Sequence, residues 1–226
     1  QFIKFVNHRS KLLSETLNYF LKHVRDNINT KPVSYFSNGA LRLSNNTNIY
    51  NCFDKFIAAL SYYSSWSAGI SVWKEHFSNL DLGKQFDAFF PHTDILFNER
   101  HCNKYIIDNT ILFEDIPVDV TKKGKYDLFQ AFAVDYIQLL EQLYKDGDIT
   151  QKTFNQIKSA NGWFLANLYF TYVILQRPCS YDLSGYNKAI GMYYSDFEIK
   201  IKVPFVVMRM VAGMIIRRIK MVINCV

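Results

Sequence analysis

The chain has 226 residues, of which 49% are hydrophobic and 20% are charged. This composition excludes an intrinsically disordered chain, and the length is enough to bury a core. The longest apolar run, Val203 to Ile216, contains Arg209 and is too short to cross a bilayer, so we expect no transmembrane segment. We expect one domain over residues 1–226, in which an internal boundary would fall at 114–125.

The charge of the chain is concentrated near its C-terminal end. Lysine and arginine number 26 against 20 aspartate and glutamate residues, a net charge of +6. No acidic residue follows Glu198. Six basic residues beyond it account for the whole excess: Lys200, Lys202, Arg209, Arg217, Arg218 and Lys220. A basic segment on an otherwise neutral chain indicates a contact surface for an acidic partner.

The cysteines and the overall composition bear on the source of the protein. Cys52, Cys102, Cys179 and Cys225 are far apart and form no CxxC pair. Dispersed thiols in a chain of this length are typical of an intracellular protein, either cytoplasmic or within a viral or organellar assembly. Asn, Ile, Lys, Tyr and Phe are abundant while Gly and Pro are scarce, which fits an AT-rich genome.

The first half of the chain predicts short elements of both kinds. Leucines and aromatic residues at helical spacing predict an amphipathic helix over residues 10–26. Strands at 33–36 and 40–43 would flank an Asn-Gly turn, the signature of a tight hairpin. A second helix is predicted at 50–64 and a third at 66–77, where large apolar residues recur every three or four positions. The alternative is one kinked helix through both segments.

Two long helices are predicted in the second half. Residues 126–144 carry a stripe of apolar residues at helical spacing, and the next helix is apolar nearly all round. Pro178 ends this second helix, because proline cannot continue the ladder of hydrogen bonds. We therefore expect a helical hairpin over 126–176 at the centre of the core.

A different period follows the hairpin. Between Asp196 and Val203, apolar and charged residues alternate, which is the pattern of a half-buried strand. The predicted fold is therefore mainly α, a helical domain built on the hairpin with a small β element at 193–210. The alternative is an α+β fold, in which 105–113 and 193–210 belong to one sheet.

Asp182 and the triplet Glu198-Ile199-Lys200 resemble the metal-binding residues of nucleases of the PD-(D/E)xK type. Those enzymes place an acid on one strand and an acid-x-lysine on the next, and on a strand Glu198 and Lys200 would project from the same face. The resemblance implies that the two carboxylates hold Mg²⁺ while the lysine orients or deprotonates the attacking water. It covers a short segment and lacks the proline before the first acid. The other interpretation is a solvent-exposed ladder of paired opposite charges.

One further segment contains residue types that bind zinc. Between residues 91 and 102 these are His92, Asp94, Glu99, His101 and Cys102. No two of them have i, i+4 or CxxC spacing, and a structural zinc site usually needs four ligands, so we predict no metal site here. The chain also lacks the P-loop, the dinucleotide-binding glycines, the G-x-S-x-G elbow and the H-E-x-x-H zinc motif.

These observations favour a non-enzymatic interaction or structural subunit of a larger assembly, with other protein subunits as its partners. Its contact surface would be the basic C-terminal segment, and nucleic acid is the first acidic candidate. A membrane surface is less favoured, because a short amphipathic helix with three cations is a weak anchor. The segment could also close the core of its own domain. The alternative function is the Mg²⁺-dependent nuclease.

Overall fold

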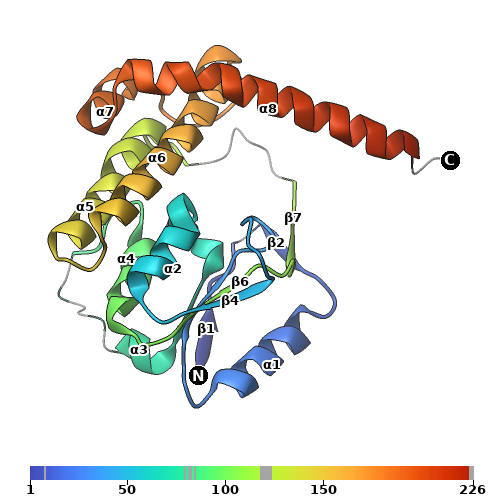
Figure 1. Ribbon diagram of the computed structural model, residues 1–226, viewed down its shortest axis with the longest axis vertical. Helices are drawn as coiled ribbons and strands as arrows, with labels where there is room; N and C mark the ends of the chain where they lie inside the picture. The colour runs from blue at the N-terminus through green and yellow to red at the C-terminus, as the bar shows by residue number, and fades with distance from the viewer. Residues whose placement is uncertain (8, 79, 81–82, 84, 118–123, 224–226) are drawn as a thin grey trace. The chain divides into compact units, whose positions relative to one another are not determined.

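Figure 1 shows a computed structural model of the chain. It describes residues 1–223 except 8, 79, 81–82, 84 and 118–123, and it describes side chains as far as Ile216. The chain divides into two compact units. Unit 1 comprises Gln1–Asp119 and Gln138–Lys158, and unit 2 comprises Val120–Ile137 and Ser159–Val226. One of the three division points lies within 114–125, a segment whose residues 118–123 are outside the described part.

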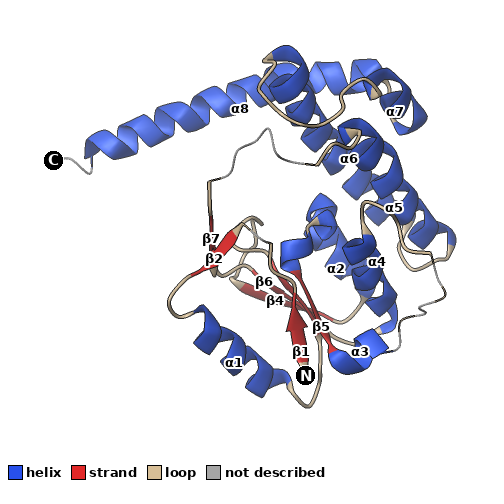
Figure 2. Cartoon of the chain, turned by 180° about the vertical axis from the view of Figure 1, so that it is seen from behind, coloured by secondary structure: helices blue, strands red, loops and turns tan. Residues whose placement is uncertain are grey.

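The fold is α+β, and the prediction of a mainly α fold is wrong. The chain is 56% helical and 13% strand, with a five-stranded mixed sheet and a two-stranded sheet (Figure 2). Residues 193–210, which were expected to form a β element, belong to helices α7 and α8 or to the link between them. The α+β alternative has the right class, but it places 193–210 in a sheet where the structure has a helix.

All strands among the described residues lie between Phe2 and Asp115. In the larger sheet their order is β1-β5-β3-β6-β4, and β2 pairs with β7. Only β3 and β6 run parallel; the other pairs are antiparallel. Their bounds are β1 Phe2–Lys4, β2 Ser10–Leu12, β3 Val33–Phe36, β4 Thr47–Tyr50, β5 Ile70–Trp73, β6 Tyr105–Asp108 and β7 Phe113–Asp115.

The helices agree with the hairpin predicted in the second half, and two helices of the first half overlap those predicted at 10–26 and 50–64. The α-helices are α1 Thr16–Asn27, α2 Phe53–Leu60, α3 Lys74–Ser78, α4 Pro91–Asn98, α5 Tyr136–Lys145, α6 Gln151–Leu168, α7 Tyr186–Tyr193 and α8 Asp196–Ile223. Short 3₁₀ segments are η1 Ser61–Ser65, η2 Ser67–Gly69 and η3 Glu99–His101. Two π-helical turns, η5 Gln130–Asp135 and η6 Tyr169–Ile174, lie at the ends of the hairpin. The hairpin contributes residues to both units.

Three predictions for the first half need correction. The segment 66–77, expected to be one helix, contains η2, strand β5 and most of α3. The four residues of β5 are all buried, and a short buried strand has the same apolar run as a buried helix. The strand expected at 40–43 is absent, and β3 pairs instead with β5 and β6. Asn38 and Gly39 do have positive φ angles of 51° and 76°. However, the Asn38 side chain accepts hydrogen bonds from the amides of Leu112 and Phe113, so it serves another loop.

Helices cover both faces of the five-stranded sheet in unit 1. Side chains alternate along each strand, so Ser34 and Phe36 lie on one face of β3 and Tyr35 on the other. On the first face, Phe20 of α1 meets Phe36 edge to face, with ring centroids 5.0 Å apart. On the second face, Phe56 of α2 stacks on Tyr105 of β6 at 4.9 Å. The sheet is therefore a middle layer between α1 and α2.

Candidate functional site

The C-terminal segment forms one long helix, α8, of 28 residues. Its start is encoded locally: the Glu198 amide donates to Ser195 Oγ at 3.0 Å, and Asp196 and Glu198 place negative charge in the first turn. Pro204 lies inside the helix and removes the amide that would bond to the Lys200 carbonyl. At 1.5 Å per residue the helix is about 42 Å long.

The residues of the nuclease hypothesis do not have the arrangement that the strand would have given them. Glu198 and Lys200 are two residues apart on a helix, which separates them by about 200° around its axis. Lys200 pairs with Asp196 at 2.7 Å. Asp182 is exposed and accepts a hydrogen bond from the Ser184 amide at 2.9 Å, which lowers the pKa of its carboxyl group. Each of these groups is thus engaged with a neighbour in its own segment.

The six basic residues of the tail are all in α8. Among those whose side chains the structure describes, two are paired with carboxylates of the same helix. Besides the Lys200 pair, Lys202 Nζ lies 2.9 Å from Glu198 Oε1, and only 12% of the Lys202 side chain is exposed. Arg209 is exposed to solvent. The side chains of Arg217, Arg218 and Lys220 lie outside the described part of the chain.

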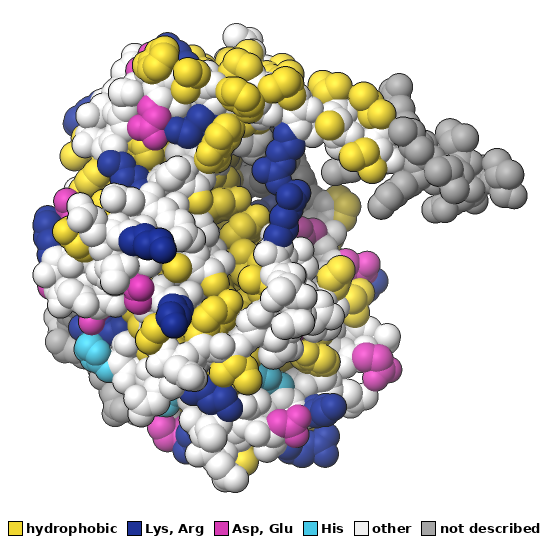
Figure 3. Space-filling model, in the orientation of Figure 1, with side chains coloured by type: hydrophobic (Ala, Val, Ile, Leu, Met, Phe, Trp, Pro, Cys, Tyr) yellow, Lys and Arg dark blue, Asp and Glu magenta, His cyan; other side chains and the backbone are white. Residues whose placement is uncertain are grey.

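One face of α8 is a row of large apolar side chains in contact with solvent. Six of them, spaced three or four residues apart, are between 43% and 73% exposed; we call them the apolar stripe: Phe197, Ile201, Phe205, Met208, Val211 and Ile215. Figure 3 shows hydrophobic side chains gathered along this helix. The opposite face is buried through Ile199, Val203 and Val206. Trp163 of α6, itself 43% exposed, widens the apolar surface where its ring meets that of Phe205 at 6.1 Å.

Sequence reasoning did not find the apolar stripe, although two signals for it were present. Ser195 and Glu198 have the S-x-x-E spacing of a capping box, which marks the start of a helix. The spacing of three and four residues also continues from Phe197 to Ile215. A helix that has apolar residues on two opposite faces also contains stretches in which apolar and polar residues alternate. The stretch from Asp196 to Val203 alternates in this way, and its pattern therefore predicts a strand.

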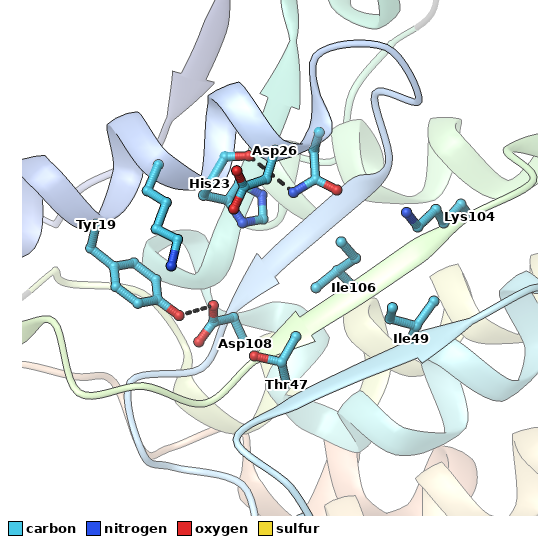
Figure 4. A pocket seen from close by; sticks show the side chains of 10 residues that line it. Tyr19, His23, Asp26, Thr47, Ile49, Lys104, Ile106 and Asp108 are labelled. Atoms are coloured by element: carbon cyan, nitrogen blue, oxygen red, sulfur yellow. Dashed lines mark hydrogen bonds between the residues drawn. The ribbon is translucent and has the colours of Figure 1, made fainter.

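A second feature, in unit 1, is a pocket of about 290 Å³ between α1 and the β4 edge of the sheet (Figure 4). Tyr19 points into it from α1 and donates a hydrogen bond of 2.6 Å to Asp108 Oδ2 at the end of β6. Asp108 is only 2% exposed. The remaining walls carry charges of both signs and two isoleucines: Lys22, His23, Asp26, Asn27, Thr47, Ile49, Lys104 and Ile106.

Two of the groups that line the pocket have shifted pKa values. Burial lowers the pKa of His23, and burial followed by the hydrogen bond to Asp108 raises the pKa of Tyr19. His23 Nε2 lies 3.0 Å from Ser34 Oγ, but Ser34 is fully buried, so no substrate can reach that hydroxyl. The pocket is therefore suited to bind a small polar molecule and lacks an accessible serine nucleophile among the residues that line it.

The zinc-type residues of 91–102 are not brought together as a set. His92 donates to the Ser65 carbonyl at 2.8 Å, and Asp94 accepts from the Asp87 amide at 2.7 Å. The His101 ring is 75% exposed and lies 4.0 Å from Asp148. Glu99 and Cys102 do converge, together with His76 from a different element.

Comparisons with known proteins add no family or relative. A scan against protein-family models finds no model that matches this sequence, and a search of curated proteins finds no match. Among the residues that the structure describes, no helix combines the length and the hydropathy that crossing a bilayer requires.

Proposed function

We propose that this chain acts at an anionic membrane surface, to which it attaches through the apolar stripe of α8. The observation that carries the proposal is the exposure of six large apolar side chains along one face of a single helix. Scattered exposed apolar residues are ordinary on a protein surface, but a contiguous apolar face usually marks a binding site. A helix of this kind lies in the interface between headgroups and acyl chains and does not cross the bilayer.

Basic charge next to an apolar face favours an anionic lipid surface as the occupant. The part of α8 beyond Glu198 carries only basic charges, which suit the negative headgroups of an anionic leaflet. Fully burying a side chain of the size of Ile or Phe stabilises by about 1.5–3 kcal/mol, so burying six half-exposed ones would contribute on the order of 5 kcal/mol before entropic costs. Each basic residue near the surface adds about 1 kcal/mol. The two contributions together are enough for stable peripheral binding.

Nucleic acid has less support as the partner of α8. Binding to phosphates depends on free cations, and Lys200 and Lys202 are each paired with a carboxylate one turn earlier. A row of apolar side chains also offers no hydrogen bonds to phosphates or bases. The Mg²⁺-dependent nuclease has still less support, because the strand on which it depended is a helix.

Co-sedimentation with lipid vesicles tests the proposal. The full chain is mixed with vesicles of phosphatidylcholine alone and with vesicles that also contain phosphatidylserine, at low and at high salt. We expect strong binding to the phosphatidylserine vesicles, weaker binding at high salt and weak binding to the neutral vesicles. Absence of binding to both vesicle types overturns the proposal, as does equal or tighter binding to a DNA or RNA duplex at the same salt. A stable homodimer that buries α8 would also overturn it.

A further inference from the structure

Three side chains with metal-binding atoms converge in unit 1, and none of them lines the pocket. His76 Nδ1 and Glu99 Oε2 are 2.7 Å apart, and Cys102 Sγ lies 3.5 Å from the same carboxylate oxygen. All three atoms lie within 4.8 Å of one another. Glu99 is 4% exposed, and 21% of the His76 side chain is exposed, so the cluster is shielded from solvent without being closed to it.

The local backbone holds Glu99 and Cys102 side by side. Glu99 begins the 3₁₀ segment η3, and the Cys102 amide donates to its carbonyl at 3.1 Å. In a 3₁₀ turn, side chains three residues apart eclipse each other, so this turn sets the thiol beside the carboxylate. The Tyr105 hydroxyl also donates to the Glu99 carbonyl, at 3.0 Å, and fixes the turn against β6. His76 reaches the pair from α3.

His76 Nδ1 faces the Glu99 carboxylate. It lies 2.7 Å from Oε2, although the pair does not have the geometry of a hydrogen bond. The same carboxylate oxygen therefore faces both a ring nitrogen and the Cys102 thiol. A cation placed among the three atoms would satisfy the imidazole nitrogen, the carboxylate and the sulfur together.

We propose that His76, Glu99 and Cys102 form a zinc-binding site. The donor set decides the metal, because imidazole nitrogen, carboxylate oxygen and cysteine sulfur are the three ligand types of Zn²⁺, whereas Ca²⁺ and Mg²⁺ prefer oxygen alone. The Sγ to Oε2 distance of 3.5 Å already suits two ligands of one tetrahedral ion. The Nδ1 to Oε2 distance must widen slightly. Three protein ligands leave the fourth position of the ion to water or to another ligand.

The site is tested by isothermal titration calorimetry, in which the chelator-treated full chain is titrated with Zn²⁺ alone. We expect one ion per chain and a higher melting temperature in the presence of zinc. Loss of a direct ligand should weaken binding by more than about 100-fold, the upper range for second-shell changes, so Cys102→Ser and His76→Gln should each show this loss. The matched controls are Cys52→Ser, at an exposed cysteine, and His101→Gln, at an exposed histidine near Glu99; both should bind zinc like the parent.

A measurement on the unaltered chain removes the risk that a variant fails to fold. Co²⁺ in place of zinc should give the intense near-ultraviolet band that reports a bond between cobalt and a thiolate. Absence of zinc binding, absence of that band, or equal zinc affinity in Cys102→Ser and Cys52→Ser would each overturn the proposal. In those cases the cluster is an ion pair between His76 and Glu99 with a neighbouring thiol.

Discussion

Lys202 Nζ donates a hydrogen bond of 2.9 Å to Glu198 Oε1, one turn earlier in the same element. In a strand the backbones of residues four apart are separated by about 13 Å, so this pair exists only because the segment is a helix. Glu198 thereby supplies a counter-charge to the Lys202 ammonium group. That group lies over the Trp163 ring, and only 12% of the Lys202 side chain is exposed. Because the tail is a helix, the positive charge of Lys202 is neutralised by a carboxylate of the same segment.

Breaking the Glu198–Lys202 pair should destabilise the chain more than breaking the more exposed Asp196–Lys200 pair. Glu198→Gln leaves the Lys202 ammonium, whose side chain is 12% exposed, without its counter-charge, and we expect a loss of about 1 kcal/mol in the free energy of unfolding. The matched control is Lys200→Gln, which breaks the other i, i+4 pair of α8, between two half-exposed groups, and should have a smaller effect. Urea denaturation measures both. Equal effects of the two substitutions would contradict this account of Lys202.

Neutralising the last three basic residues of α8 should weaken attachment to anionic membranes selectively. At about 1 kcal/mol for each cation near the surface, the triple variant Arg217→Gln, Arg218→Gln, Lys220→Gln should bind phosphatidylserine vesicles about 100-fold more weakly at low salt. Binding to phosphatidylcholine vesicles should not change. Co-sedimentation of parent and variant with both vesicle types gives the comparison, and an unchanged affinity for the anionic vesicles would speak against an electrostatic contribution.

The stability of the fold should rise with pH above neutrality because of Lys4. Burial lowers the pKa of Lys4 from 10.5 to about 7, although its ammonium group contacts the carbonyls of Phe5, Ala68 and Ile70. Between these two pKa values the unfolded chain binds more protons than the folded chain, so the free energy of unfolding increases with pH. The slope is at most about 1.4 kcal/mol per pH unit.

The lysine responsible can be identified by substitution. Urea unfolding of the parent is measured from about pH 7 to about pH 9, below the range in which tyrosine ionises. Lys4→Met should remove the upward slope, and the control Lys74→Met, at an exposed lysine of α3, should keep it. A flat profile for the parent would mean that the three carbonyls keep the Lys4 ammonium charged throughout.

The Tyr19 hydroxyl should contribute measurably to stability through Asp108. Tyr19→Phe removes a hydrogen bond of 2.6 Å to a carboxylate that is 2% exposed, and hydrogen bonds to charged groups contribute about 1.5–3 kcal/mol. We expect a loss near the lower value in the free energy of unfolding, because Asp108 keeps its bond from the Thr110 amide. Tyr144→Phe, where the ring stacks on Phe154, is the matched control, and its effect should stay within about 0.5 kcal/mol.

The parts of the fold that could be predicted are those where one period is unambiguous. The hairpin at 126–176 has long helical stripes, and the structure has helices there. Strand β5 is a run of four buried residues, too short for its period to show, so its sequence predicts a helix equally well. The sheet as a whole depends on pairing between strands far apart in sequence, such as β3 with β6, and no local pattern encodes that pairing.

The candidate sites differ in what the sequence could reveal. The apolar stripe from Phe197 to Ile215 could be predicted from the sequence. The prediction requires that the capping box at Ser195 be given more weight than the alternation of apolar and charged residues that follows it. The cluster of His76, Glu99 and Cys102 was not readable, because His76 is supplied by a separate helix whose position depends on the tertiary fold. The 3₁₀ turn supplies two of the three ligands, Glu99 and Cys102.

One pair of variants tests attachment through the apolar stripe most directly. Met208 on the stripe and Met192 on α7 are 57% and 53% exposed, so changing each to glutamate makes the same chemical change at the same exposure in the same unit. Co-sedimentation with phosphatidylserine-containing vesicles should show that Met208→Glu loses about tenfold or more in affinity, because it removes a buried apolar contact and adds a repelled charge. Met192→Glu should bind almost like the parent. Equal affinities for the two variants would contradict the central claim that α8 inserts its apolar stripe into a membrane surface.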